Sequence, residues 1–221
     1  DERAARVKLL MPSCDGKAEY QVPGGTALRK GGEGEVPGGR WVKVSASEPY
    51  GFASDALYNF DARKGLFRAT IARTSHYSCD KAYNADEMPE LPSTDSGEYR
   101  FKFLLGPADS SLKVLSECLE MQPFVQTVPP LAGGELERIG SVFSIDGNAF
   151  KLLAFKPAID GQGLILRVQE TSGKNSELKV HFFGSNLKLG KIGAFKIATF
   201  RLKKVKGGLA VAKAFSDETL L

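Results

Sequence analysis

The sequence predicts an all-β protein built as two sandwich-like parts with one short helix. Its 221 residues include 24 glycines and 11 prolines, which divide a chain into short elements joined by turns. Trp41–Ser45 (WVKVS) and Leu66–Arg73 (LFRATIAR) alternate apolar and polar residues, the period of a half-buried strand. The turn sequence Asp160-Gly161-Gln162-Gly163 lies between two apolar runs and predicts a β-hairpin.

The first part of the chain reads as short strands interrupted by one long loop. The loop is expected over 23–39, where glycine and proline are frequent and no helix follows that could hold a phosphate. Expected strands are 7–11, 18–22, 41–45, 50–53, 56–60 and 66–73.

A polar loop over 74–97 precedes a strand at 99–105 and the single helix at 110–121. Leu112, Leu115 and Leu119 recur at helical spacing, Ser110 or Ser111 can cap the helix, and Pro123 ends it.

The second part follows a linker rich in proline and glycine within 125–140. Strands are expected near 141–145, 149–155, 164–169, 178–183, 194–202 and 209–214. Arg167 and Glu170 are expected to pair on the hairpin.

Charge and cysteine content narrow the functional classes. Residues 147–221 carry 13 Lys/Arg and 5 Asp/Glu, a net charge of +8, whereas residues 1–146 carry a net −4. The lysines alternate with apolar residues and lack interleaved aromatics, so a solvated strand face is expected and no nucleic acid partner. No run of 18 apolar residues exists, so no membrane partner is expected. Three widely spaced cysteines indicate reduced thiols and a cytoplasmic location, or one disulfide with one free thiol.

An ordered set of local patterns resembles the C-terminal β-region of glycoside hydrolase family 38 α-mannosidases. The main patterns are Trp41 and Ser45 followed by Tyr50-Gly51-Phe52, the end of a strand at Ile71-Ala72-Arg73, the hairpin 151–173, and the strand 195–199. Two departures stand out. Asn59-Phe60 replaces the family's usual small residue and glycine, and Lys196 stands where an acid is common.

The resemblance implies a galactose-mutarotase-like supersandwich over 1–128, a linker over 129–140 and a smaller C-terminal β-sandwich over 141–221. Family 38 enzymes hydrolyse α-mannosides on a separate barrel that holds zinc through His and Asp residues. Neither His76 nor His181 is followed by the His-x-Asp pattern, so zinc is expected only in the missing catalytic domain and this chain alone is expected to be inactive. No cofactor or metal site is expected here, since His76, Cys79 and Asp80 lack a fourth ligand.

The resemblance also suggests substrate-binding residues, while no catalytic residue is expected. Arg73 is the main candidate, because a guanidinium at the end of this strand could reach sugar hydroxyls or orient a carboxylate. The alternative is an ion pair with Asp80 or Asp95. Tyr50 and Asn59 are weaker candidates on a neighbouring loop.

Expected partners are the catalytic barrel of the same parent chain and an α-mannoside in the intact enzyme. An apolar docking face left uncovered could also support a dimer. A free-standing carbohydrate-binding β-sandwich is the alternative function, which would require exposed aromatics on one sheet face.

Overall fold

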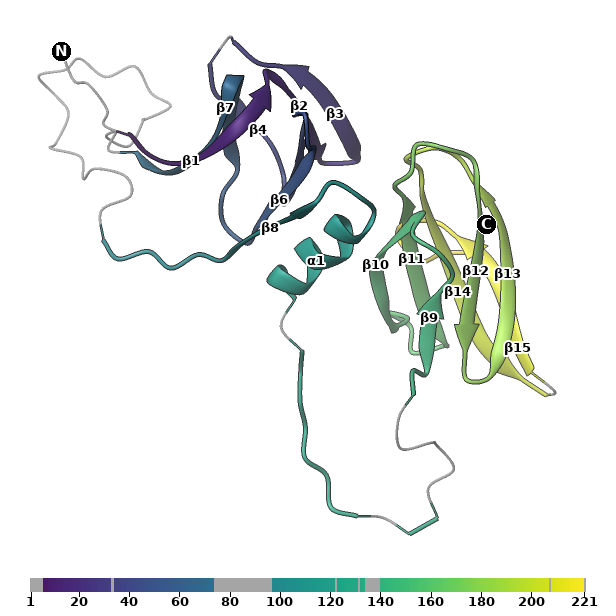
Figure 1. Cartoon of the computed structure of the whole chain (residues 1–221). Coiled ribbons are helices and arrows are strands. Elements are labelled where there is room, and N and C mark those ends of the chain that lie inside the picture. Colours follow the sequence, from purple (N-terminus) through teal and green to yellow (C-terminus); the bar gives the residue numbers. More distant parts are fainter. Residues whose placement is uncertain are drawn as a thin grey trace, which may run out of the picture. The chain divides into compact units, whose positions relative to one another are not determined.

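The computed structural model describes residues 6–32, 34–73, 97–121, 123–130, 132–133, 140–206 and 208–220. They form two units, Asp1–Phe124 and Val125–Leu221, which we call the N-terminal and C-terminal units (Figure 1). Strands dominate both units, and the described residues contain a single short α-helix, so the prediction of an all-β protein with one helix is confirmed. That helix is too short and too polar to cross a membrane.

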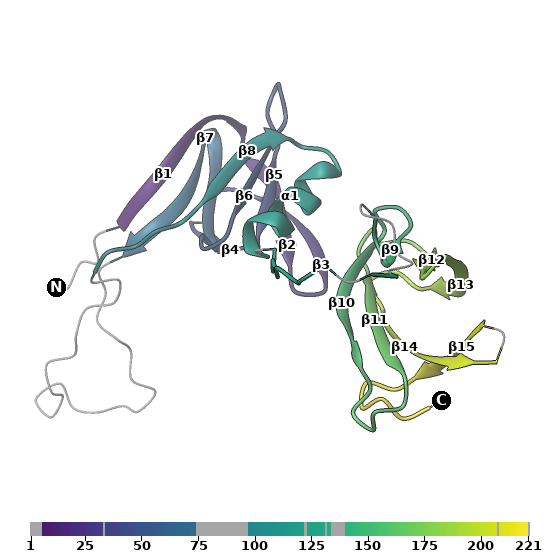
Figure 2. The same cartoon turned by 90° about the horizontal axis from the view of Figure 1, so that it is seen from below.

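Two antiparallel sheets form the N-terminal unit (Figure 2). One sheet has the order β3-β2-β5-β6-β8, and the other has the order β1-β7-β4. The strands are β1 (Arg6–Asp15), β2 (Lys17–Val22), β3 (Gly25–Lys30), β4 (Val36–Pro37), β5 (Trp41–Val44), β6 (Tyr50–Ser54), β7 (Asn59–Arg73) and β8 (Phe103–Pro107).

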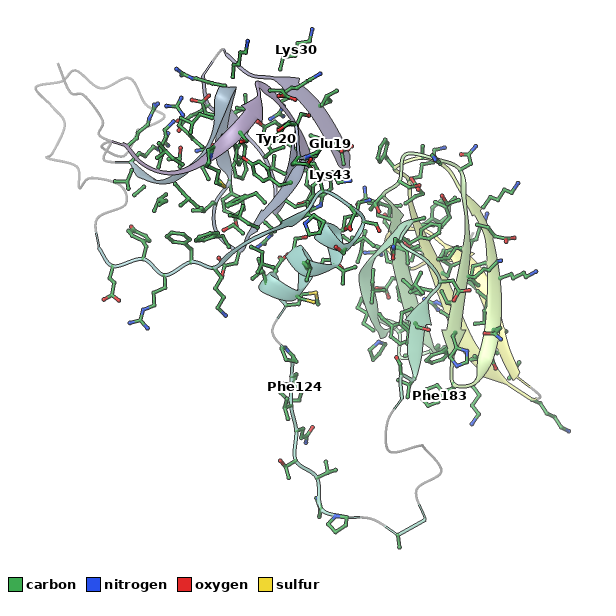
Figure 3. All side chains as sticks on the ribbon, in the orientation of Figure 1. Glu19, Tyr20, Lys30, Lys43, Phe124 and Phe183 are labelled. Carbon is green, nitrogen blue, oxygen red and sulfur yellow. The ribbon has the colours of Figure 1, made fainter. Side chains whose placement is uncertain are left out.

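Aromatic side chains from both sheets fill the core of this unit. Phe52 of β6 lies 5.9 Å from Phe60 and 6.0 Å from Phe67 between ring centroids, and both partners belong to β7. All three rings are fully buried, as is Tyr20 of β2 to within 1% of its surface. Such aromatic pairs add about 0.5–1.5 kcal/mol each beyond the area they bury. Part of the opposite face of the larger sheet is polar, for example where Glu19 lies opposite Lys43 (Figure 3).

The helix α1 (Ser111–Glu120) covers the outer side of the larger sheet. Leu112 is buried against Trp41 and Ala53. Gly51 makes this approach feasible, because a Cβ at that position would lie 2.7 Å from a methyl carbon of Leu112. The helix ends at Met121, where the backbone becomes extended.

The C-terminal unit is a second sandwich, with one sheet in the order β10-β11-β14-β15 and the other in the order β13-β12-β9. Its strands are β9 (Phe143–Ile145), β10 (Phe150–Pro157), β11 (Leu164–Glu170), β12 (Ser176–Phe182), β13 (Ser185–Ile192), β14 (Ile197–Val205) and β15 (Gly208–Ala214). Buried Leu166 and Phe200 from the first sheet meet Leu178 and Val180 from the second.

The hairpin predicted around residues 160–163 is present. β10 pairs with β11 in antiparallel register, from Phe150 opposite Glu170 to Pro157 opposite Leu164. Gly163 has φ +98°, and a Cβ there would lie 2.3 Å from the Leu202 carbonyl oxygen. Glycine is therefore required where this turn packs against β14.

Several predicted boundaries were wrong. Residues 25–30 form β3 rather than a loop, because Gly24 at φ +87° closes a tight hairpin that pairs them with β2. The strand expected at 99–105 begins at Phe103, and β13 was missed altogether. The polar loop expected over 74–97 lies, apart from its last residue, outside the described residues.

The expected pair between Arg167 and Glu170 does not form. Glu170 is fully buried and accepts hydrogen bonds from backbone and hydroxyl groups, while Arg167 donates to the Thr199 hydroxyl at 3.1 Å and to the Ser216 carbonyl at 2.6 Å. Arg167 and Glu170 are three positions apart on one strand, so their side chains leave opposite faces of the sheet.

Candidate functional site

The three residues predicted to bind substrate lie on different parts of the N-terminal unit. Asn59 begins β7, and Arg73 ends the same strand 14 positions later. β7 doubles back between these two residues, since the ring centroids of Phe60 and Phe67 lie 5.8 Å apart and Arg68 donates a hydrogen bond to Asp61. Tyr50 begins β6, in the other sheet. The three candidates thus come from three different strand ends in two sheets.

The structure shows the strand partners or contacts of each of these residues. The half-buried Tyr50 donates its hydroxyl hydrogen to the Pro12 carbonyl at 3.4 Å, and burial together with the nearby Cys14 raises its pKa to about 12. Asn59 lies opposite Pro37 in the register of β4 and β7. Arg73 is exposed and lies opposite Arg6 of β1.

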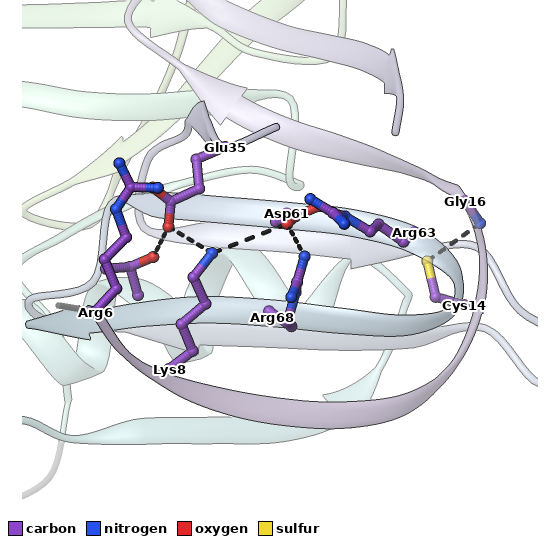
Figure 4. A network of polar contacts seen from close by, with 9 residues as sticks. Arg6, Lys8, Cys14, Gly16, Glu35, Asp61, Arg63 and Arg68 are labelled. Atoms are coloured by element: carbon purple, nitrogen blue, oxygen red, sulfur yellow. Dashed lines mark hydrogen bonds and ion pairs between the residues drawn. The ribbon is translucent and has the colours of Figure 1, made fainter. Parts of the chain in front are cut away.

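Arg73 lies at one end of the sheet in which β1 pairs with β7. The same sheet carries a dense charge cluster (Figure 4). We call this cluster the Asp61–Glu35 network. It contains the two acids together with Arg6, Lys8, Arg63, Arg68 and Thr70 from β1 and β7. With four cations and two carboxylates, the network carries a net positive charge.

Asp61 is the buried centre of the network, with 1% of its surface exposed. Its carboxylate accepts a hydrogen bond from Arg63 Nε at 3.2 Å and one from Arg68, and Lys8 Nζ lies 3.9 Å away. A carboxylate removed from water requires such partners, because an unpaired buried charge is costly.

Glu35 joins the two strands at the other side of the network. Lys8 Nζ lies 2.8 Å from its carboxylate, Arg6 lies at 3.2 Å, and Thr70 donates its hydroxyl hydrogen. Burial acts to raise the pKa of Glu35, but the hydrogen bonds from Lys8 and Thr70 outweigh it and hold the pKa below its usual value. Glu35 is therefore ionised at neutral pH and does not serve there as a proton donor.

No local sequence pattern predicts this network. Its cations come from β1 and β7, whereas Glu35 comes from the segment before β4 and Asp61 from the beginning of β7. Only the folded pairing of β1 with β7 brings Lys8 opposite Thr70 and Leu10 opposite Arg68.

Two of the three cysteines lie among the described residues. Cys14 is a buried free thiol and Cys118 an exposed one, while Cys79 lies outside the described residues. His76 and Asp80 lie outside them as well, as do both acids proposed to pair with Arg73. In the part of the chain that the structure describes, no three His, Cys, Asp or Glu side chains are grouped as metal ligands would be.

Comparison with known proteins shows that part of the chain is similar to a known family. Residues 149–199 match the model of the glycosyl hydrolases family 38 C-terminal beta sandwich domain. No curated protein matches the sequence.

Two solved structures from Enterococcus faecalis share the fold. An alpha-mannosidase from strain V583 is 15% identical, with a TM-score of 0.71 over 89% of this chain and 25% of that chain. A protein in the glycosyl hydrolase family 38 is also 15% identical, with a TM-score of 0.67 over 89% of this chain and 26% of that chain. This chain thus spans about a quarter of the length of the structures it matches. Residues 149–199 therefore match the family 38 C-terminal beta sandwich domain, and the resemblance of the chain to the C-terminal β-region of family 38 α-mannosidases is confirmed.

Proposed function

We propose that this chain serves as a non-catalytic C-terminal region of an α-mannosidase and braces a zinc-dependent catalytic barrel. The observation that carries the proposal is the shared fold, since 89% of this chain superimposes on a quarter of an alpha-mannosidase. The remaining three quarters of such an enzyme would supply the barrel, the zinc ion and the substrate cleft.

Exposed apolar side chains on the N-terminal unit support a bracing role. Val7 and Leu10 of β1 are each 58% exposed, and Leu105 of the edge strand β8 is 55% exposed. Side chains of this kind lose apolar contact with water when another protein surface packs against them. We infer that the catalytic barrel covers them in the intact enzyme.

The first test is an activity assay on the purified 221-residue chain. With 4-nitrophenyl α-mannoside and added zinc we expect no release of nitrophenol above the rate in buffer, because the proposed reacting groups belong to the barrel. Zinc-dependent turnover by this chain alone would show that the non-catalytic assignment is wrong.

The second test concerns Arg73 within a protein that includes the barrel. If Arg73 reaches the substrate cleft, Arg73→Ala lowers kcat/KM by about tenfold, equivalent to about 1.4 kcal/mol, and Arg73→Lys restores only part of it because the planar fork is lost. Arg100→Ala is the matched control, since Arg100 is an exposed arginine paired only with Glu98 among the described residues. Unchanged kcat/KM with a lowered melting temperature would assign Arg73 a structural role instead.

A further inference from the structure

Three aspartates in the sequence are followed directly by a glycine, namely Asp15, Asp146 and Asp160. The Asp-Gly pair is open to a spontaneous chemical change, because glycine has no Cβ to shield its amide nitrogen from the aspartate side chain. Two of the pairs have nearly the same neighbours, Ile-Asp-Gly-Asn at 145–148 and Ile-Asp-Gly-Gln at 159–162. The sequence alone therefore does not distinguish them, whereas the structure holds them differently.

Asp160 is restrained at both of the groups that would react. Its carboxylate accepts hydrogen bonds from the Gln162 amide at 2.9 Å and from Arg201 Nη1 at 2.7 Å. These two donors hold the pKa of Asp160 below its usual value, so the neutral carboxyl, the form that a nitrogen attacks, is scarce. The Gly161 amide, which would be the attacking group, donates to the Ala158 carbonyl at 2.9 Å. The two groups can approach only after hydrogen bonds are lost.

Asp15 is restrained through its backbone. It is the last residue of β1, and its amide donates to the Ser45 carbonyl at 2.7 Å. The following Gly16 amide donates to Cys14 Sγ at 3.3 Å, and the Gly16 carbonyl accepts from the Gly31 amide at 2.6 Å. The attacking nitrogen is therefore engaged at this position as well.

Asp146 lacks these restraints. It follows β9 directly, and both Asp146 and Gly147 are exposed. The Asp146 amide donates to the Lys179 carbonyl at 3.0 Å, which fixes the backbone on the side of β9 only. Among the described residues, no hydrogen bond or ion pair engages the Asp146 carboxylate, and the Gly147 amide donates no hydrogen bond. The carboxyl and the nitrogen are thus free to meet.

We propose that Asp146 is the site at which this chain isomerises spontaneously to an isoaspartyl linkage. The Gly147 nitrogen attacks Cγ of the neutral Asp146 carboxyl. An N–C bond forms, the C–OH bond breaks, and the hydroxyl leaves with the amide hydrogen as water. A second water then opens the five-membered succinimide ring, and opening at the backbone carbonyl routes the chain through the side chain. The reaction needs no other reagent, and the site does not depend on the proposed bracing role.

The product adds one methylene group to the backbone at the edge of a sheet. β9 (Phe143–Ile145) has only three residues, and it is the edge strand of the sheet β13-β12-β9. The change falls on the residue directly after this strand, where the Asp146 amide continues the contact with β12 through Lys179. Isomerisation therefore alters the connection from β9 to β10.

The test is incubation of the folded full chain in ¹⁸O-labelled water below its melting temperature, followed by peptide mapping with mass spectrometry. Each ring opening adds one ¹⁸O atom, so the label measures the reaction at each aspartate separately. We expect isoaspartate to form at Asp146 at least about tenfold faster than at Asp15 or Asp160, because those reactions must first break hydrogen bonds. An equal or faster reaction at Asp160, or no reaction at Asp146, would overturn the proposal.

The same incubation in urea is the control for the role of the fold. In the unfolded chain the three Asp-Gly pairs are expected to react at similar rates, because the hydrogen bonds that restrain Asp15 and Asp160 are gone. A preference for Asp146 that persisted in urea would mean that the neighbouring residues select the site, which contradicts the proposal.

Two variants at exposed positions complete the test. Asn148→Gln makes the two tetrapeptides identical, and we expect the folded chain to keep its preference for Asp146. Loss of the preference would assign it to the side chain at position 148 and refute a role of the fold. Asp146→Glu keeps the charge but would require a six-membered ring, so label uptake at this position is expected to fall to background. Unchanged uptake there would contradict the proposed cyclisation.

Discussion

Replacing Glu170 with glutamine is expected to destabilise the C-terminal unit by about 3 kcal/mol, because buried donors would lose a charged acceptor. The fully buried carboxylate accepts the amide hydrogens of Ser172, Gly173 and Phe195 at 2.9–3.0 Å. It also accepts from the Ser172 and Ser176 hydroxyls. These bonds tie the turn after β11 to the turn before β14. The NH₂ group of the glutamine side chain would instead point its two hydrogens at neighbouring groups that are themselves hydrogen-bond donors. Urea unfolding, followed through NMR signals of the C-terminal unit, measures the change.

The same residue predicts a dependence of stability on pH. Burial acts to raise the pKa of Glu170, but the Ser172 hydroxyl and the surrounding amides outweigh it and lower the pKa from 4.5 to about 2. The unfolded chain then binds the proton more readily than the folded one. The contribution is complete above about pH 4.5 and is lost as the pH falls from 4.5 to about 2.

Glu177→Gln is the matched control for Glu170→Gln. Glu177 is 44% exposed and pairs with Lys179 at 3.4 Å on the surface of β12, so its loss is expected to cost less than about 0.5 kcal/mol. If Glu170→Gln changed stability no more than this control, or kept the full acid sensitivity of the wild type, the buried acceptor role would be refuted.

Replacing Asp61 with asparagine is expected to destabilise the N-terminal unit by about 3 kcal/mol. Removing one member of a buried ion pair typically costs about 3–5 kcal/mol, and the partial exposure of Arg63 and Arg68 places this case at the lower end. Arg68 is the most affected partner, because its Nη2 donates to Asp61 and its Nε is buried without a hydrogen-bond partner among the described residues.

Tryptophan fluorescence measures this effect on the N-terminal unit alone. Trp41 is the single tryptophan in the sequence and is 4% exposed on β5. Glu98→Gln serves as the control, because Glu98 and Arg100 are 79% and 91% exposed and such pairs contribute about 0–1 kcal/mol. A midpoint for Asp61→Asn equal to that of the control would mean that water already screens the network.

Local sequence patterns were sufficient to predict several strands and the hairpin. Alternation located β5 and the second half of β7, and glycine chemistry located the turn between β10 and β11. β3 was missed because a single positive-φ glycine, Gly24, turns an apparently irregular stretch into a hairpin. No local signal distinguishes such a turn from a loop until the partner strand is in place.

The candidate sites were less accessible to sequence reasoning than the strands. Arg73, Tyr50 and Asn59 were chosen through the family resemblance, and the structure places them at the end of β7, the start of β6 and the start of β7. Their role in substrate binding remains a proposal. The Asp61–Glu35 network was not predicted, since it joins Lys8 to Glu35 and to Asp61, residues that lie far apart in the sequence.

The amino-acid sequence by itself determined the all-β class, the single helix and the family resemblance, because these depend on periodicity, turn residues and short ordered patterns along the chain. Only the tertiary structure decided which charges meet. Glu170 could have paired with Arg167, but strand geometry sends the two side chains to opposite faces and surrounds the acid with amides and hydroxyls instead. Burial and partner choice depend on distant strands that meet in space, and a linear sequence does not contain those distances.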